Sequence, residues 1–383
     1  MEKNNKNLNV PNLRFPEFSG EWEKGTLQSV ATLSKGTGIS KDQLSEDGQP
    51  CILYGELYTK YKSEIIDVII SKTDIDSQKL VRSQTNDVII PCSGESAVDI
   101  ATARCVKQSD VLLGGDLNII RLKGEHDGSF FAYQLNGKRK YDIAKVAQGV
   151  SVVHLYGEHL KGVKVDYPSA AEQKKISSLL ALIDQRIETQ KKIIEDLKKL
   201  KDAIRTKLFT SLESHCNEYD EIRNMLHYEQ PSAYLVNSTE YSEDYPTPVL
   251  TANKAFILGY TDEEYGVYDK GDCIIFDDFT MDLKYVTFPF KVKSSAIKIL
   301  TPKQNIDLYF IYEYLLYLGL VSEEHKRHYI SEIESMSIIR PQLKEQRQIS
   351  QPLQSLEMQV GNAIALQKLL AKQKQNLLSQ MFI

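Results

Sequence analysis

Residues 168–187, PSAAEQKKISSLLALIDQRI, and residues 341–360, PQLKEQRQISQPLQSLEMQV, are two versions of one segment. The match continues without a gap, so that 168–209 corresponds to 341–382. Apolar residues occupy eight of ten positions spaced alternately by four and three in each copy. Residues identical in both copies include Pro168/Pro341, Glu172/Glu345, Gln173/Gln346, Ile176/Ile349, Ser177/Ser350, Leu180/Leu353, Lys199/Lys372, Lys201/Lys374 and Phe209/Phe382.

This period of 3.5 residues is typical of a coiled-coil seam, whereas the apolar stripe of a globular helix is wider. It predicts two long helices, each about 60 Å in length, that pack antiparallel. A helical hairpin inside a larger core is the alternative. Lys201 and Lys374 share one seam position, where a polar residue costs stability and fixes the register. Pro352 predicts a short helix and then a fresh helix start near that residue, because proline kinks a helix interior.

Each copy of the helical segment follows a segment that is rich in Ile, Val, Tyr and Phe, with turn residues at short intervals. Such a pattern predicts strands, here at 88–93, 117–124, 273–279 and 295–300. Each segment also contains one aromatic helical stretch, 128–137 and 305–319, in which Phe131–Tyr133 matches Phe310–Tyr312.

The expected fold class is therefore α+β, with two mixed α/β globules separated by two long antiparallel coiled-coil helices in a pseudo-two-fold internal repeat. The expected domains are a first globule with an N-terminal arm, a first spacer helix, a second globule and a second spacer helix, at 1–167, 168–212, 213–340 and 341–383 respectively.

Composition limits the function classes. Of 383 residues, 42% are hydrophobic and 26% charged, as in a soluble globular protein, and no apolar run reaches the length of a membrane span. The N-terminus MEKNNKNLNVP lacks the apolar core of a signal peptide, and the five cysteines are scattered without a Cys-x-x-Cys pair, so we expect a cytoplasmic location, no membrane contact, no disulfide framework and no zinc ribbon. Residues 213–340 carry 11 Lys+Arg against 22 Asp+Glu, which is the main objection to nucleic-acid binding.

Catalytic signatures are absent from the sequence. It contains neither a G-x-x-x-x-G-K-[ST] phosphate loop nor the N-P-P-[YF] or D-P-P-[YF] motif of base methylation. Asp277 and Asp278, with Lys284, could imitate the carboxylate pair of a nuclease, but acidic strand ends are common. His154 lies beside Tyr156 in what reads as an ordinary turn. We therefore expect no catalytic residues, no metal site and no enzyme activity in this chain.

The chain strongly resembles the specificity subunit of Type I restriction–modification systems over nearly its full length. The resemblance rests on the order globule, helix, globule, helix and on P-x-x-x-E-Q-x-x-I in both helix copies. The other segments that carry it are VPNLRFPEFSGEWEKGTL (10–27), GTGIS (36–40), CSGES (92–96), GGDLNIIRL (114–122), QGVSVVHL (148–155), TPVLTANKAFILGYT (247–261), IIFDDFT (274–280) and FPFKVKSSAIKIL (288–300).

The resemblance implies that each globule is a target-recognition domain for one half of a bipartite, asymmetric site in double-stranded DNA. It implies that the helices act as a spacer, and that two methyltransferase subunits and two restriction–translocase subunits bind this chain. S-adenosylmethionine, ATP and Mg would then belong to those partners, with no cofactor in this chain. The alternative from another class is a coiled-coil scaffold with two protein-binding globules.

Base reading requires donors and acceptors on exposed loops, and phosphate contact requires basic or small hydroxyl side chains. In the first globule, the predicted DNA-binding residues lie in glycine-containing turns next to strand ends: Lys35, Thr37, Ser40, Tyr54, Glu56, Tyr58, Ser93, Glu95 and Gln148. The second offers Thr251, Asn253, Lys254, Asp278, Thr280, Lys291, Lys293, Ser294 and Ser295. In the second globule, KVKSSAIK concentrates Lys291, Lys293 and Lys298 in an expected basic patch. Lys291 and Lys293 are expected to project together, because alternate strand residues share a face.

Overall fold

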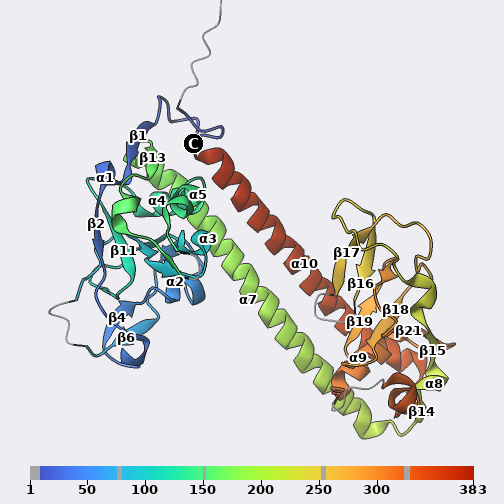
Figure 1. Ribbon diagram of the computed structural model, residues 1–383. Helices are drawn as coiled ribbons and strands as arrows, with labels where there is room; N and C mark the ends of the chain where they lie inside the picture. Colours follow the sequence, from blue (N-terminus) through green and yellow to red (C-terminus); the bar gives the residue numbers. More distant parts are fainter. Residues whose placement is uncertain (1–8, 76–79, 150–151, 252–255, 323–327) are drawn as a thin grey trace, which may run out of the picture. The chain divides into compact units, whose positions relative to one another are not determined.

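The computed structural model describes residues 9–75, 80–149, 152–251, 256–322 and 328–383. Its contacts divide the chain into two units (Figure 1). Unit 1 comprises residues 1–191 together with 365–383, and unit 2 comprises residues 192–364. Within the described residues no helix is both long and apolar enough to span a membrane.

Unit 1 is a mixed α/β fold around a five-stranded sheet of order β2-β11-β7-β9-β5. A four-stranded sheet, β10-β4-β6-β3, and the pairs β1-β13 and β12-β8 complete it. The strands are β1 Glu23–Thr26, β2 Ala31–Lys35, β3 Leu44–Ser45, β4 Gln49–Ile52, β5 Ile65–Ile66, β6 Ser71–Thr73, β7 Asp87–Pro91, β8 Ser93–Gly94, β9 Arg104–Val106, β10 Leu112–Leu113, β11 Leu117–Leu122, β12 Val153–His154 and β13 Lys164–Tyr167. The short helices are α1 Leu27–Val30, η1 Lys41–Gln43, α2 Glu56–Thr59, α3 Ala97–Ile100, α4 Gly128–Asn136, α5 Lys140–Val146 and α6 Gly157–Leu160.

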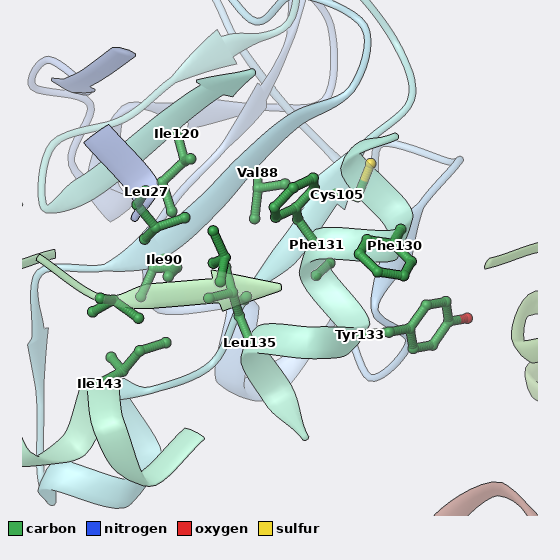
Figure 2. Packing of buried hydrophobic residues seen from close by; sticks show 14 of the residues in the cluster. Leu27, Val88, Ile90, Cys105, Ile120, Phe130, Phe131, Tyr133, Leu135 and Ile143 are labelled. Carbon is green, nitrogen blue, oxygen red and sulfur yellow. The ribbon is translucent and has the colours of Figure 1, made fainter. Parts of the chain in front are cut away.

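The core of unit 1 lies between the central sheet and α4. Figure 2 shows Val88 of β7 between Phe131 of α4 and Ile120 of the neighbouring strand β11, and all three are fully buried. The helix begins where it does because Asp127 is its N-cap, whose carboxylate accepts a hydrogen bond from the Phe130 amide at 3.0 Å.

Unit 2 repeats this topology. Its central sheet has the order β15-β21-β18-β19, matching β2-β11-β7-β9 of unit 1, and in both units the middle pairs are antiparallel. The sheet β17-β16-β20 and the pair β14-β22 complete it. The elements are β14 Tyr219–Glu221, α8 Ile222–Met225, β15 Leu226–Glu229, η2 Pro231–Tyr234, β16 Thr247–Leu250, β17 Ile257–Thr261, β18 Cys273–Asp277, β19 Leu283–Val286, β20 Lys291–Val292, β21 Ile297–Pro302, α9 Leu308–Leu318, η3 Tyr329–Ile333 and β22 Ser337–Ile339.

Two long helices, α7 Ala170–His215 and α10 Leu343–Met381, belong partly to each unit. In unit 1 the core contains Ile176 and Leu180 from the start of α7 together with Phe382, which follows the end of α10. In unit 2 the core contains Phe209 from near the end of α7 and Leu353 from near the start of α10. Within each unit the start of one helix therefore packs with the end of the other, which confirms the antiparallel pairing expected from the seam.

The repeated proline and glutamine fasten each long helix to the globule that precedes it. In unit 1 the Gln173 side chain donates to the Pro168 carbonyl at 2.8 Å and accepts from the Asp127 amide at 3.0 Å. The same two bonds recur in unit 2, where both distances are 2.8 Å, among Gln346, Pro341 and Asp307. The buried amide thus connects the start of α7 to the N-cap of α4 and the start of α10 to the N-cap of α9. This shared task explains why these residues are identical in both copies.

The seam lysines fasten the other end of each helix. Lys374 Nζ lies 2.7 Å from Asp184 and 2.6 Å from Glu64, and it lies over the Tyr133 ring at 5.5 Å. The Tyr133 hydroxyl also donates to Asp184 at 2.7 Å. Burial, followed by the charge of Glu64, raises the pKa of Asp184, while Lys374 and Tyr133 oppose that rise.

Unit 2 holds the equivalent lysine in the same way. Lys201 Nζ lies 2.7 Å from Glu313 and 2.6 Å from Glu357, and it lies over the Tyr309 ring at 5.8 Å. Glu313 also accepts from Arg205 Nε at 2.7 Å. Each seam lysine therefore completes an ion-pair cluster with the helix that faces it and with its unit's globule, as a register-fixing residue does.

Two details of the sequence analysis were wrong. Helix α10 runs through Pro352 without a fresh start. Proline removes the bond that its amide would make to the carbonyl of Gln348, but Gln348 and Pro352 are both exposed, so water can bind that carbonyl. Buried Ile349 and Leu353 keep the helix on the core.

The match of the two aromatic helices was also displaced by one residue. Both helices begin at an aspartate N-cap, and Asp307 accepts from the Phe310 amide as Asp127 does from Phe130. The equivalent residues are therefore Phe130 and Phe310, not Phe131 and Phe310. The sequence match followed the Phe-x-Tyr pattern that both helices contain, whereas the shared aspartate N-cap sets the structural alignment.

Candidate nucleic-acid interface

Four of the residues predicted in unit 1 lie in one connected set of turns. β8 pairs with β12, which places Ser93 opposite His154, and Gln148 forms a backbone bridge to His154. The Tyr58 hydroxyl donates to the Ser93 carbonyl at 2.9 Å. Burial raises the pKa of Tyr58, so this hydroxyl stays protonated and can donate. Lys35, at the end of β2, reaches the Tyr156 ring, which follows β12.

Side chains in these turns form an exposed polar and aromatic group, which we call the β8–β12 cluster: Lys35, Ser93, Asp116, His154 and Tyr156. Lys35 Nζ lies 5.6 Å from the centre of the Tyr156 ring, and the Tyr156 and His154 rings stack at 6.3 Å. Ser93 Oγ lies 3.3 Å from His154 Nδ1 and 3.4 Å from Asp116 Oδ2. The β8–β12 cluster therefore brings together an ammonium, a phenol ring, an imidazole, a hydroxyl and a carboxylate on one surface.

The backbone beneath this cluster is rigidly hydrogen-bonded. The Cys92 amide donates to the Asp116 carbonyl at 2.7 Å, and the Leu155 amide donates to the Cys92 carbonyl at 2.9 Å. Burial raises the pKa of Cys92 to about 11, so its thiol remains neutral. A side chain at Gly94 would meet the Tyr58 hydroxyl at 2.9 Å, so the glycine permits the close approach of these turns.

The remaining unit 1 predictions are dispersed. Ser40 caps η1, and Thr37 is half-buried, with its hydroxyl accepting from the Val81 amide at 3.1 Å. Tyr54 and Glu95 are exposed. Glu56 is buried, and its carboxylate accepts from the Leu53 amide and from Lys60.

In unit 2 the structure leaves a smaller set on the surface. Lys293 is exposed and lies 5.8 Å from the centre of the Tyr241 ring. Thr280 is exposed, and Ser294 and Ser295 are half-buried. Asn253 and Lys254 lie outside the residues that the structure describes.

The expectation of a basic patch at 291–298 was wrong. Lys291 is 2% exposed and pairs with Glu263 at 2.9 Å, and Lys298 is 1% exposed and pairs with Asp278 at 3.2 Å. A buried ammonium must find a counter-charge, and both lysines do so inside the unit. Only Lys293 of the three projects into solvent.

The expectation that every predicted residue stands on an exposed loop was likewise wrong for Glu56, Thr251, Asp278 and Lys291, which are all buried. Asp278 binds Lys298 and the Tyr329 amide. Its neighbour Asp277 accepts from the Phe279 amide at 2.8 Å and so shapes a turn. In the described parts of the chain, no cluster of His, Cys, Asp and Glu is arranged to hold a metal ion.

The turns after β7 and after β18 occupy equivalent places in the two units. The Asp278 amide donates to the Ala296 carbonyl and the His328 amide donates to the Asp278 carbonyl, both at 3.0 Å, as at Cys92 of unit 1. The side chains there differ, because a buried aspartate replaces the buried cysteine and Phe279 replaces Ser93. The two units thus present different chemistry on one framework.

Sequence reasoning missed Asp116. It interpreted the segment of His154 and Tyr156 as a turn, with a DNA contact there only as an alternative that the resemblance implies. Asp116 has φ 57°, a backbone conformation in which aspartate is enriched, and it follows Gly114-Gly115, so the GGD sequence was an available signal of an exposed turn. The β8–β12 pairing joins residues 61 positions apart, and no local pattern reports such a contact.

Comparisons with known proteins agree with this architecture. A family model described as "Type I restriction modification DNA specificity domain" matches residues 19–199. The EcoR124I/EcoR124II type I restriction enzyme specificity subunit of Escherichia coli is 46% identical over 120 residues, which is 30% of each chain. A Methanocaldococcus jannaschii protein, named as a type I restriction enzyme MjaX specificity subunit, is 22% identical over 92% of this chain and 90% of its own.

A solved structure extends the match of fold to nearly the whole chain. The Type I restriction–modification S subunit from M. genitalium superposes with a TM-score of 0.70 at 18% identity, covering 98% of this chain and 99% of its own. The comparisons do not favour a general scaffold. The family model, the partial relative and the shared fold agree: residues 19–199 match the DNA specificity domain of the Type I restriction–modification family, and the chain as a whole is similar to the specificity subunits of these systems.

Proposed function

We propose that this chain is the DNA-reading subunit of a Type I restriction–modification complex and directs adenine methylation or cleavage that partner subunits carry out. Each unit reads one half of a bipartite, asymmetric site in double-stranded DNA. The paired helices α7 and α10 act as the spacer between the half-sites. Double-stranded DNA is the common ligand of both units.

The observation that carries this proposal is the contrast between what the units share and what they do not. The bonds of Gln173 and Gln346 and the ion-pair clusters of Lys374 and Lys201 are repeated. The exposed turns after β7 and β18 are not. A constant framework with two different surfaces suits a molecule that recognises two different sequences.

The partners proposed are two methyltransferase subunits and two restriction–translocase subunits. S-adenosylmethionine, ATP and Mg are assigned to those partners. Because Lys291 of β20 and Lys298 of β21 are buried in ion pairs, unit 2 presents little free positive charge along these two strands. Phosphate contacts supplied by the methyltransferases compensate for this, since phosphate neutralisation dominates DNA affinity.

Two measurements test the proposal. Mapping of methylated adenines in DNA from cells that carry the system should give two unlike half-sites and a fixed gap. DNA affinity measured at one salt concentration should be weak for the isolated chain and tight for its complex with methyltransferase subunits. Equal affinity of the two would contradict the shared phosphate contacts, and a complex without any sequence preference would contradict the proposed function itself.

A further inference from the structure

The β8–β12 cluster contains a chain of hydrogen bonds that sets the chemistry of one exposed ring nitrogen. Ser93 has a single hydroxyl proton and two neighbours, Asp116 and His154. An ionised carboxylate can only accept a hydrogen bond. The Ser93 proton therefore points to Asp116, and Ser93 Oγ accepts from Nδ1–H of His154.

This orientation fixes the tautomer of neutral His154. With the proton on Nδ1, Nε2 carries a lone pair and is an acceptor. No described residue forms a hydrogen bond with Nε2, and the His154 side chain is exposed. Stacking on Tyr156, with the rings 30° from parallel, restrains the orientation of the imidazole.

The order of contacts differs from that of a hydrolase. In a Ser-His-Asp triad the carboxylate binds the histidine, which in turn activates the serine. Here Asp116 contacts Ser93 and not His154. The arrangement therefore orients a ring and does not prepare a nucleophile.

Lys35 supplies the second component of the cluster. Its ammonium lies over the Tyr156 ring, 43% of whose residue surface is exposed, and Lys35 forms no ion pair with any described acidic residue. A lysine held over an aromatic face keeps its charge available and its position restricted. A DNA phosphate is the natural counter-charge for such a group.

We infer that His154, oriented by Ser93 and Asp116, reads a base in the half-site of unit 1, and that Lys35 binds an adjacent phosphate. The inference rests on the proposed function and assigns residues to it. As an acceptor, Nε2 selects a base with an exocyclic amino group in the major groove, which means adenine N6 or cytosine N4.

The test uses the chain in complex with its methyltransferase subunits. The probes are duplexes that contain the site mapped from methylated adenines and every single base-pair change in it. His154→Ala should lower affinity for the mapped site roughly tenfold to a hundredfold and abolish preference at one adenine or cytosine. Lys35→Met should weaken binding to all duplexes alike and reduce the slope of log affinity against log salt by about one.

A conservative variant separates base reading from a loss of structure. In Asp116→Asn the amide can donate to Ser93 Oγ, which frees the Ser93 proton for Nδ1 and makes Nε2–H a donor. This variant should shift the preference at the same position from amino-bearing towards oxo-bearing bases, while it keeps the melting temperature of the wild type. His227→Ala and Lys24→Met, at exposed positions outside the cluster, are the matched controls.

The outcomes are distinct. If the wild-type complex prefers its mapped site and His154→Ala leaves every base preference intact, the inference is overturned and the proposed function stands. If Asp116→Asn behaves as wild type at all positions, the tautomer argument is overturned. If the wild-type complex shows no preference, the proposed function has failed first.

Discussion

Replacing Lys374 by methionine should destabilise unit 1 far more than the same change at Lys372. Methionine keeps most of the side-chain volume and removes the ammonium that lies between Asp184 and Glu64. Lys372 is on the same helix and also identical in both repeats, but it is exposed. Both variants replace lysine by methionine, so they differ only in whether the lysine forms buried ion pairs.

The magnitude follows from the burial of the three groups. The side chains of Lys374, Glu64 and Asp184 are 16%, 11% and 13% exposed. Removing one partner of a buried pair costs about 3–5 kcal/mol, and the residual access of water places this case near the lower end, ~3 kcal/mol. For a unit of this size that loss lowers the melting temperature by roughly 6–12 °C. Lys372→Met should change stability by less than about 0.5 kcal/mol.

The loss should depend on pH. Burial and the charge of Glu64 raise the pKa of Asp184 in the folded state, and Lys374 counteracts that rise. Without the lysine the pKa rises further. A group with a raised folded pKa favours folding most when it is protonated and disfavours it as pH rises through that pKa. The difference between variant and wild type should therefore be larger at neutral pH than at mildly acidic pH.

Thermal unfolding of the full chain, followed by hydrogen exchange in α4 and α10 to identify the unit that opens, measures both effects. Adding Asp184→Asn and Glu64→Gln to Lys374→Met should recover stability, because the two unpaired charges are then gone. If Lys374→Met costs no more than Lys372→Met, or if the triple variant recovers nothing, the ion-pair cluster does not stabilise unit 1.

Three further predictions concern the long helices and their contacts with the globules. Gln346→Leu breaks the hydrogen bonds to the Pro341 carbonyl and the Asp307 amide, so it should lower the free energy of unfolding of unit 2 by about 1–3 kcal/mol in denaturant. An unchanged unfolding midpoint would refute the fastening role. Pro352→Ala restores a backbone donor in exposed helix and should stabilise the chain by about 1–3 kcal/mol, and a lower melting temperature would show that the proline is needed. Phe382→Ala empties a site beside Phe130 and should destabilise unit 1 by about 3–5 kcal/mol, whereas a change below 1 kcal/mol, measured in the same way, would contradict its place in the core.

The long helices and the sheet strands could be predicted because their signals are local. The seam from Ile176 onward repeats within a few residues, and the strand expected at 117–124 becomes β11, Leu117–Leu122, in which four of six residues are Leu or Ile. The antiparallel pairing was also predicted, because each copy of the seam follows a globular segment of its own. These features depend on spacing along the chain, which the sequence displays directly.

The candidate site was predicted less well because its residues are assembled by long-range pairing. The three lysines of KVKSSAIK predict a positive surface, but Glu263 neutralises Lys291 and Asp278 neutralises Lys298 inside unit 2. The sequence around Lys291 gives no sign that Glu263 is its partner. Conversely His154 gains its significance from Ser93, which only the β8–β12 ladder brings near.

The placement of Phe382 has a consequence for biosynthesis. Unit 1 contains residues from the first part of the chain together with residues 365–383, so its core stays open while everything between them is being translated. Unit 2 contains only residues 192–364 and can close earlier. A premature stop codon shortly before residue 365 would therefore leave unit 2 nearly complete. Unit 1, although most of it is translated first, could not complete its core.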